Sequence, residues 1–202
     1  MYNDTLLHGV GFPGEYCNDG SVLVVKNHYD VNRTIKSAQF DSIILLIRNP
    51  RDSILATYNM EYAKKIEYEQ SDNETIVLIN FHVFVAPPSV FRKSPDKWSS
   101  RVTFHLQEWT KLYTDWLTNY QGPILVVFYE NLINDTRNEL KSILDFLNVT
   151  VSEWDIMCAI DRQNDLDNIF RRLKKFKYFD PFTKDMYKKM ELAKNRVYSL
   201  VK

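Results

Sequence analysis

Residues 45–54 read LLIRNPRDSI, an apolar run that passes directly into two arginines and a helix-start signal. The apolar run closes a strand predicted over residues 40–47, and the apolar spacing after Asn-Pro predicts an amphipathic helix. Asn49 is expected at the N-cap of this helix. Arg48 then lies beside a helix start, whose free N–H groups and positive dipole end attract anions. The stretch predicts a site for a phosphate-like group, although an ion pair between Arg48 and Asp52 would explain the same residues.

Strands and helices alternate along the rest of the chain. SVLVVKNH (residues 21–28) and ILVVFYEN (residues 124–131) are β-branched runs that predict two further buried strands. Helices are predicted over residues 98–119, over residues 136–147 and from Lys184, and an exposed loop over residues 67–75. This alternation predicts an α/β fold, with a parallel sheet flanked by helices, in a single domain over residues 1–202.

The overall charge of the chain is balanced. Its 202 residues include 26 Lys and Arg and 26 Asp and Glu, and 45% of the residues are apolar. Such a composition predicts a packed core without a strong overall field. Nucleic-acid binding through bulk charge is therefore disfavoured, and any anion site must be a local cluster. No metal-ligand spacing occurs in the sequence, so no metal is expected.

Glycosylation sequons favour the lumen of the secretory pathway. Asn-x-Ser/Thr occurs at five positions, Asn3, Asn32, Asn73, Asn134 and Asn148. The N-terminal residues do not form a signal peptide, and no apolar run reaches the about 18 residues of a membrane span. Targeting and membrane attachment are therefore expected to come from a segment that is not in this chain. Two cysteines, Cys17 and Cys158, leave both a disulfide and two buried thiols open.

Unusual polar groups follow the predicted strands. Lys26 and His28 end the first strand, Arg48 follows the second, and Tyr129 with Glu130 ends the third. In an open parallel sheet, ligands bind beyond the carboxyl ends of the strands. These groups are therefore the candidates for a ligand site.

The order of these motifs resembles the sulfotransferase superfamily. The similar segments are VKNH, IRNPRDSILATYN, the Trp-rich helix, VVFYENLINDTRNELKSILDFLNV and CAIDRQNDLDNIFRR with KYFDPFT. They are most similar to the WSC-domain-containing, Golgi-type membrane sulfotransferases. The resemblance implies a P-loop-NTPase-like fold and transfer of a sulfuryl group from 3′-phosphoadenosine 5′-phosphosulfate to a hydroxyl of a glycan. A non-catalytic nucleotide-binding or interaction module derived from such an enzyme is the alternative.

The resemblance assigns the donor's 3′-phosphate to the stretch quoted first, with Arg48 as the contacting arginine. The family often has a serine eight positions later, where this chain has Ala56, so Ser53 or Thr57 is expected to substitute. Tyr129 matches a position near the adenine in cytosolic relatives; a place in the core is the alternative for this residue.

Arg171 and Arg172 fall where a basic segment of the family also reaches the 3′-phosphate. A solvated basic face is the alternative for this segment. Relatives begin with a strand and a phosphate-binding loop, whereas GVGFPGEY (residues 9–16) lacks the expected Lys-Ser/Thr. The resemblance thus predicts a domain without its first βα unit.

Lys26 and His28 are the catalytic candidates that the resemblance implies. Alternation along a strand places both side chains on one face. An ammonium group can stabilise the charge that builds on the leaving oxygen, and a neutral imidazole can take the proton of an acceptor hydroxyl. The alternative is that His28 only caps its strand. His105 has no comparable neighbours in the sequence and is expected to be structural or at the surface.

Overall fold

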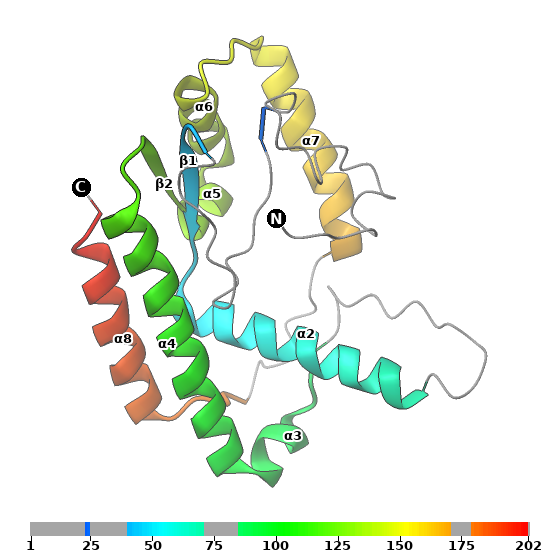
Figure 1. The fold of residues 1–202 in the computed structure, drawn as a ribbon. Coiled ribbons are helices and arrows are strands. Elements are labelled where there is room, and N and C mark those ends of the chain that lie inside the picture. Colours follow the sequence, from blue (N-terminus) through cyan, green and yellow to red (C-terminus); the bar gives the residue numbers. More distant parts are fainter. Residues whose placement is uncertain (1–22, 25–39, 71–84, 171–178, 202) are drawn as a thin grey trace.

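The computed structural model of the protein describes residues 23–24, 40–70, 85–170 and 179–201. In these ranges β1 (Ile43–Ile47) and β2 (Ile124–Phe128) form a parallel pair, in register from Ile43 opposite Ile124 to Ile47 opposite Phe128. The α/β fold with parallel strands is therefore confirmed (Figure 1). The strand predicted over residues 21–28 lies outside the described residues, apart from Leu23 and Val24, which are exposed.

All four predicted helices are present, with slightly different ends. They are α2 (Pro50–Gln70), α4 (Pro95–Asn119), α6 (Thr136–Phe146) and α8 (Lys184–Tyr198). The prediction of a loop from Glu67 is wrong as far as Gln70, because Glu, Tyr and Gln continue the helix and no Gly or Pro ends it. Three helices were not predicted: α3 (Pro88–Lys93), α5 (Tyr129–Asn134) and α7 (Glu153–Phe170).

The start of α2 has the capping geometry predicted for it. The Asn49 Oδ1 atom accepts a hydrogen bond from the Arg51 N–H at 3.0 Å. The Ser53 N–H donates to the Asn49 carbonyl at 3.0 Å, and Asp52 lies in the first turn. This local chemistry ends β1 and begins α2 within a few residues.

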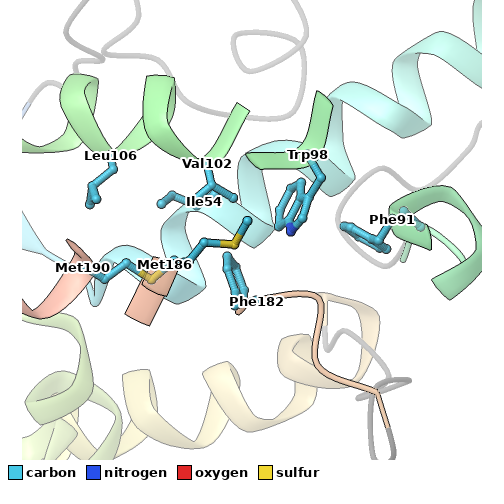
Figure 2. Close-up of a cluster of buried hydrophobic side chains, with 9 residues drawn as sticks. Ile54, Phe91, Trp98, Val102, Leu106, Phe182, Met186 and Met190 are labelled. Carbon is cyan, nitrogen blue, oxygen red and sulfur yellow. The ribbon is translucent and has the colours of Figure 1, made fainter. Parts of the chain in front are cut away.

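A large apolar cluster joins α2, α4 and α8. The helices α4 and α8 lie side by side, and α2 packs against both (Figure 1). Figure 2 shows Trp98 between Phe91 and Phe182. The centroid of the Trp98 ring is 4.9 Å from that of Phe91 and 5.3 Å from that of Phe182. Val102 lies in this cluster, whereas Phe104 on the same helix is 57% exposed. Each large buried side chain contributes about 1.5–3 kcal/mol to folding.

A second cluster fixes β1 against α4 and α8. Leu45 and Ile47 point to one face of the sheet and are buried with Trp109, Tyr113 and Val197. The indole Nε1–H of Trp109 donates to the Arg48 carbonyl at 3.0 Å, and the Tyr113 hydroxyl donates to the Leu46 carbonyl at 3.0 Å. Two aromatic residues of α4 therefore hold the carboxyl end of β1 in place.

Two further findings concern a cysteine and the length and polarity of the helices. Cys158 on α7 is half-buried and carries a free thiol, while Cys17 lies outside the described residues. Within the described ranges, every helix is too short or too polar to cross a membrane.

Candidate functional site

The register of the sheet brings two predicted site residues together. Because Ile47 is paired with Phe128, the next residues, Arg48 and Tyr129, lie side by side. The Arg48 guanidinium carbon is 4.4 Å from the centroid of the Tyr129 ring. Such a cation–π contact contributes about 0.5–2 kcal/mol. The prediction that Tyr129 ends a strand is wrong. Strand pairing stops at Phe128, and Tyr129 is the first residue of α5. Arg48 covers one face of its ring, so Tyr129 orients the arginine.

The Arg48 side chain is buried in part. Its Nε atom is buried and has no hydrogen-bond partner in the part of the chain that the structure describes. Across the ranges that the structure describes, no carboxylate pairs with Arg48; Asp52 instead pairs with Arg51, at 2.7 Å between Oδ1 and Nη1. The simple ion pair between Arg48 and Asp52 is thus excluded. A buried donor without a partner costs about 1–3 kcal/mol, a cost that an anionic ligand at this position would offset. The arrangement fits a phosphate group.

A carboxylate occupies part of the helix start, which sequence reasoning missed. The Asn49 N–H donates to Glu130 Oε1 at 2.9 Å, and the Arg51 N–H is taken by the Asn49 side chain. The prediction that free N–H groups of the helix start bind the anion is therefore wrong for these two groups. The Arg48 guanidinium is the stronger feature of the site. The sequence did place Glu130 at the end of a predicted strand, and this position could have indicated its contact with the start of α2.

Ser53 and Thr57 face a crevice between α2 and α4. Its volume is about 220 Å³, and the side chains that line it belong to Ser53, Ile54, Thr57, His105, Glu108, Trp109, Leu112 and Tyr113. The Thr57 hydroxyl already donates to the Ser53 carbonyl at 3.1 Å. The Ser53 hydroxyl is therefore the better remaining candidate for a ligand contact on this face of α2.

His105 contributes to the same crevice, which its sequence neighbours did not indicate. Its side chain is only 13% exposed. Its Nε2 atom is buried, lies 3.8 Å from Glu61 Oε1 and, among the residues that the structure describes, has no hydrogen-bond partner. Burial, and then the nearby charge of Arg101, lowers the pKa of His105. The imidazole is therefore neutral at neutral pH. Its burial agrees with the expectation of a structural histidine. A structural histidine usually has a hydrogen-bond partner for each buried nitrogen, however, and Nε2 of His105 has none among the described residues.

A larger cavity of about 560 Å³ lies between α4 and α8. It is lined by side chains of these two helices, among them Val102, Leu106, Met186, Ala193 and Arg196. None of the strand-end residues lines it. We place the candidate site at the strand ends, because the half-buried Arg48 guanidinium lies there with a buried Nε that has no hydrogen-bond partner among the described residues.

Four predicted site residues lie outside the described residues. They are Lys26 and His28, assigned to catalysis, and Arg171 and Arg172, assigned to the 3′-phosphate. Their roles remain predictions. Metal binding also finds no support in the described part of the chain, where no group of three or more His, Cys, Asp or Glu side chains is suitably placed.

The sequence of the chain matches a known protein family and several curated proteins. The model of the sulfotransferase domain matches residues 17–194. A WSCD family member of Drosophila melanogaster is 34% identical over 202 residues, which is 100% of this chain and 57% of that protein. WSCD family members of Drosophila pseudoobscura pseudoobscura and Aedes aegypti are 35% identical over 202 residues and 32% identical over 200 residues, with 100% and 98% of this chain covered.

The chain spans 56–57% of the length of these curated relatives. No solved structure matches it.

Proposed function

The chain belongs to the sulfotransferase family, of the WSC-domain-containing type, and from this premise we propose that it binds 3′-phosphoadenosine 5′-phosphosulfate and directs its sulfuryl group to a glycan hydroxyl. One observation carries the proposal: the Arg48 guanidinium at the end of β1 is aligned by Tyr129, and its buried Nε has no hydrogen-bond partner within the described ranges. A guanidinium presents several N–H donors in a plane and suits phosphate oxygens. Arg48 binds the 3′-phosphate of the donor.

The nucleotide supplies the activated sulfuryl group, and the chain supplies binding, orientation and proton transfer. In this kind of transfer the protein does little covalent work and contributes mainly by positioning and by stabilising charge. Lys26 stabilises charge on the leaving oxygen, and His28 accepts the proton of the attacking hydroxyl. Both assignments rest on the family resemblance of VKNH.

Two measurements test the proposal. Calorimetry on the purified chain is expected to detect binding of 3′-phosphoadenosine 5′-phosphate, and weaker binding of adenosine 5′-monophosphate, which lacks the 3′-phosphate. Equal affinities for the two nucleotides would contradict the assignment of Arg48.

A radiolabelled-sulfate transfer assay with sialylated and uronic-acid-containing glycans then separates the enzyme from a binding module. Turnover that disappears in His28→Ala supports the enzyme. The assay is run on the chain and on a form extended by the family's first strand and phosphate-binding loop, because the chain without this loop is expected to turn over poorly. Nucleotide binding without turnover by the extended form on any glycan of the panel supports the non-catalytic alternative.

We also propose that the protein acts in the lumen of the secretory pathway, in the Golgi. The sequons support this part of the proposal. Asn134 and Asn148 are exposed, and Asn148 has a φ of 54° in the turn that ends α6. Asn73 remains the preferred site, although it lies outside the described residues.

Secretion of a signal-fused chain is expected to yield glycans on at least one sequon. Mass spectrometry before and after glycosidase treatment measures this. An unchanged mass would count against a lumenal location.

A further inference from the structure

A tyrosine hydroxyl links the start of α2 to the segment that precedes α8. The Arg51 Nε–H donates to the Tyr187 hydroxyl at 2.9 Å, and this hydroxyl donates to Asp180 Oδ2 at 2.6 Å. Burial, followed by the hydrogen bond to Asp180, raises the pKa of Tyr187, although Arg51 acts in the opposite direction. The phenol therefore keeps its proton at neutral pH and serves both partners at once.

The far side of this link is held by several further hydrogen bonds. The Asp180 Oδ1 atom also accepts the Phe182 N–H at 3.0 Å, and Phe182 is buried in the large apolar cluster. The Trp98 indole N–H donates to the Pro181 carbonyl at 2.6 Å in a buried position. The Thr183 hydroxyl caps α8 by accepting the Met186 N–H at 3.2 Å. Asp180 is thus a fixed point against which Tyr187 and Arg51 are held.

The near side of the link carries the site. Arg51 lies in the first turn of α2, and its N–H is bonded to the side chain of Asn49, which follows Arg48 directly. The Arg48 carbonyl is held by Trp109 from α4. The short segment from Arg48 to Arg51 is therefore fastened at both ends, by Trp109 at one and by Tyr187 at the other.

We propose that Tyr187 is a positioning residue of the donor site, which acts through Arg51 to hold the start of α2, and with it Arg48, in the orientation that meets the donor's 3′-phosphate. The inference rests on the proposed function. Groups that bind a ligand tightly are held by a supporting layer of hydrogen bonds, and small errors in their placement weaken binding. Because Arg51 and Asp180 both reach solvent, each can be solvated when the hydroxyl is removed. The loss is therefore expected in ligand orientation more than in folding.

The test is the variant Tyr187→Phe, which removes one oxygen and keeps the ring against Phe182. Calorimetry should show about 3- to 10-fold weaker binding of 3′-phosphoadenosine 5′-phosphate, the effect of one lost hydrogen bond. Binding of adenosine 5′-monophosphate should not change, because it has no 3′-phosphate for Arg48 to contact. In an Arg48→Ala background, Tyr187→Phe should have no further effect on the bisphosphate, since neighbours that act as a unit are not additive.

Tyr120→Phe is the matched control. Its hydroxyl donates to the Phe40 carbonyl at 2.8 Å, at the other end of α4, so its removal should leave both nucleotide affinities unchanged. Asp180→Asn is the second variant: its single amide oxygen cannot accept both the Tyr187 hydroxyl and the Phe182 N–H, so the link should loosen. Because Tyr187 keeps its hydroxyl for Arg51, the loss should be smaller than in Tyr187→Phe and show the same selectivity.

An equal loss for both nucleotides, or a loss that adds to that of Arg48→Ala, would show a merely structural role and overturn the inference. If the unmodified chain does not bind the bisphosphate, the proposed function itself fails, whatever the variants do.

Discussion

The end of β1 and the first turn of α2 each present one arginine, and the two differ in how their charge is used. Arg51 is paired with Asp52, bonded to the Tyr187 hydroxyl and placed over the Phe182 ring at 5.6 Å. Arg48 lies over the Tyr129 ring and, among the described residues, has neither a carboxylate partner nor an acceptor for its Nε.

This difference separates a structural arginine from a ligand-binding one. A cation with its partners already in the chain has little left to offer a ligand, and removing it breaks contacts of the fold. A cation that is oriented by an aromatic ring, but not neutralised, is ready for an anion. The motif Arg-Asn-Pro-Arg alone does not distinguish these roles, because it presents the same side chain twice.

The largest expected effect is on the Arg48 side of the comparison. Arg48→Ala should weaken binding of 3′-phosphoadenosine 5′-phosphate by about 1.5–3 kcal/mol, the range for hydrogen bonds to charged groups. The free energy of unfolding should change by less than about 1 kcal/mol, because the lost cation–π contact is offset by removal of a buried donor without a partner. Calorimetry and urea denaturation measure the two quantities. Unchanged nucleotide affinity would remove Arg48 from the site.

The opposite pattern is expected for Arg51. Arg51→Ala should lower the free energy of unfolding by about 1 kcal/mol, a value that allows for solvent screening of its partly exposed ion pair. Nucleotide affinity should fall less than in Arg48→Ala, because Arg51 acts only on the orientation of its neighbour. Urea denaturation and calorimetry on the same preparations give both numbers. A larger affinity loss for Arg51→Ala than for Arg48→Ala would reverse the two roles.

Local chemistry in the sequence predicted much of this region. The strand before Arg48 and the cap at Asn49 follow from a few adjacent residues, and the long helix α4 follows from periodic apolar spacing. The β-branched run of the third predicted strand continues into Tyr129 without a turn residue, so the change to α5 was not visible.

The contacts that define the site could not be predicted in the same way. The stacking of Arg48 on Tyr129 depends on the register of β1 against β2. The bond from Arg51 to Tyr187 joins residues 136 positions apart, and the buried Nε2 of His105 depends on how α2 packs on α4. Such long-range contacts leave no periodic or local signal in a single sequence.

A smaller effect on nucleotide affinity is expected from the hydroxyl groups of Ser53 and Thr57 on α2. Ser53→Ala should weaken binding of the bisphosphate by about 0.5–1.5 kcal/mol if its hydroxyl replaces the family's serine. Ala56→Ser, which restores that serine at its usual position, should strengthen binding by a similar amount. Thr57→Val is the control, because the Thr57 hydroxyl is already bonded to the Ser53 carbonyl. An effect of Thr57→Val as large as that of Ser53→Ala would show that helix packing, and not a ligand contact, is being measured.

The smallest effect concerns the acid beside Arg48. Glu130 Oε1 accepts the Asn49 N–H, so its negative charge lies at the helix start, where an incoming phosphate would also lie. Like charges repel, and a charge in the first turn of a helix contributes about 0.3–1 kcal/mol, so Glu130→Gln should bind the bisphosphate about 2- to 5-fold more tightly. The amide oxygen of glutamine can still accept the Asn49 N–H, which leaves the cap in place.

The gain should shrink as salt is added, because ions screen partly exposed charges. Glu139→Gln, an exchange in the first turn of α6, is the control and should change neither the affinity nor its salt dependence. Calorimetric titrations of both variants at low and high salt measure this. Weaker binding by Glu130→Gln would mean that the carboxylate orients the site more than it repels the ligand. Glu130 would then support the ligand-binding arginine Arg48, whereas Asp52 neutralises the structural arginine Arg51.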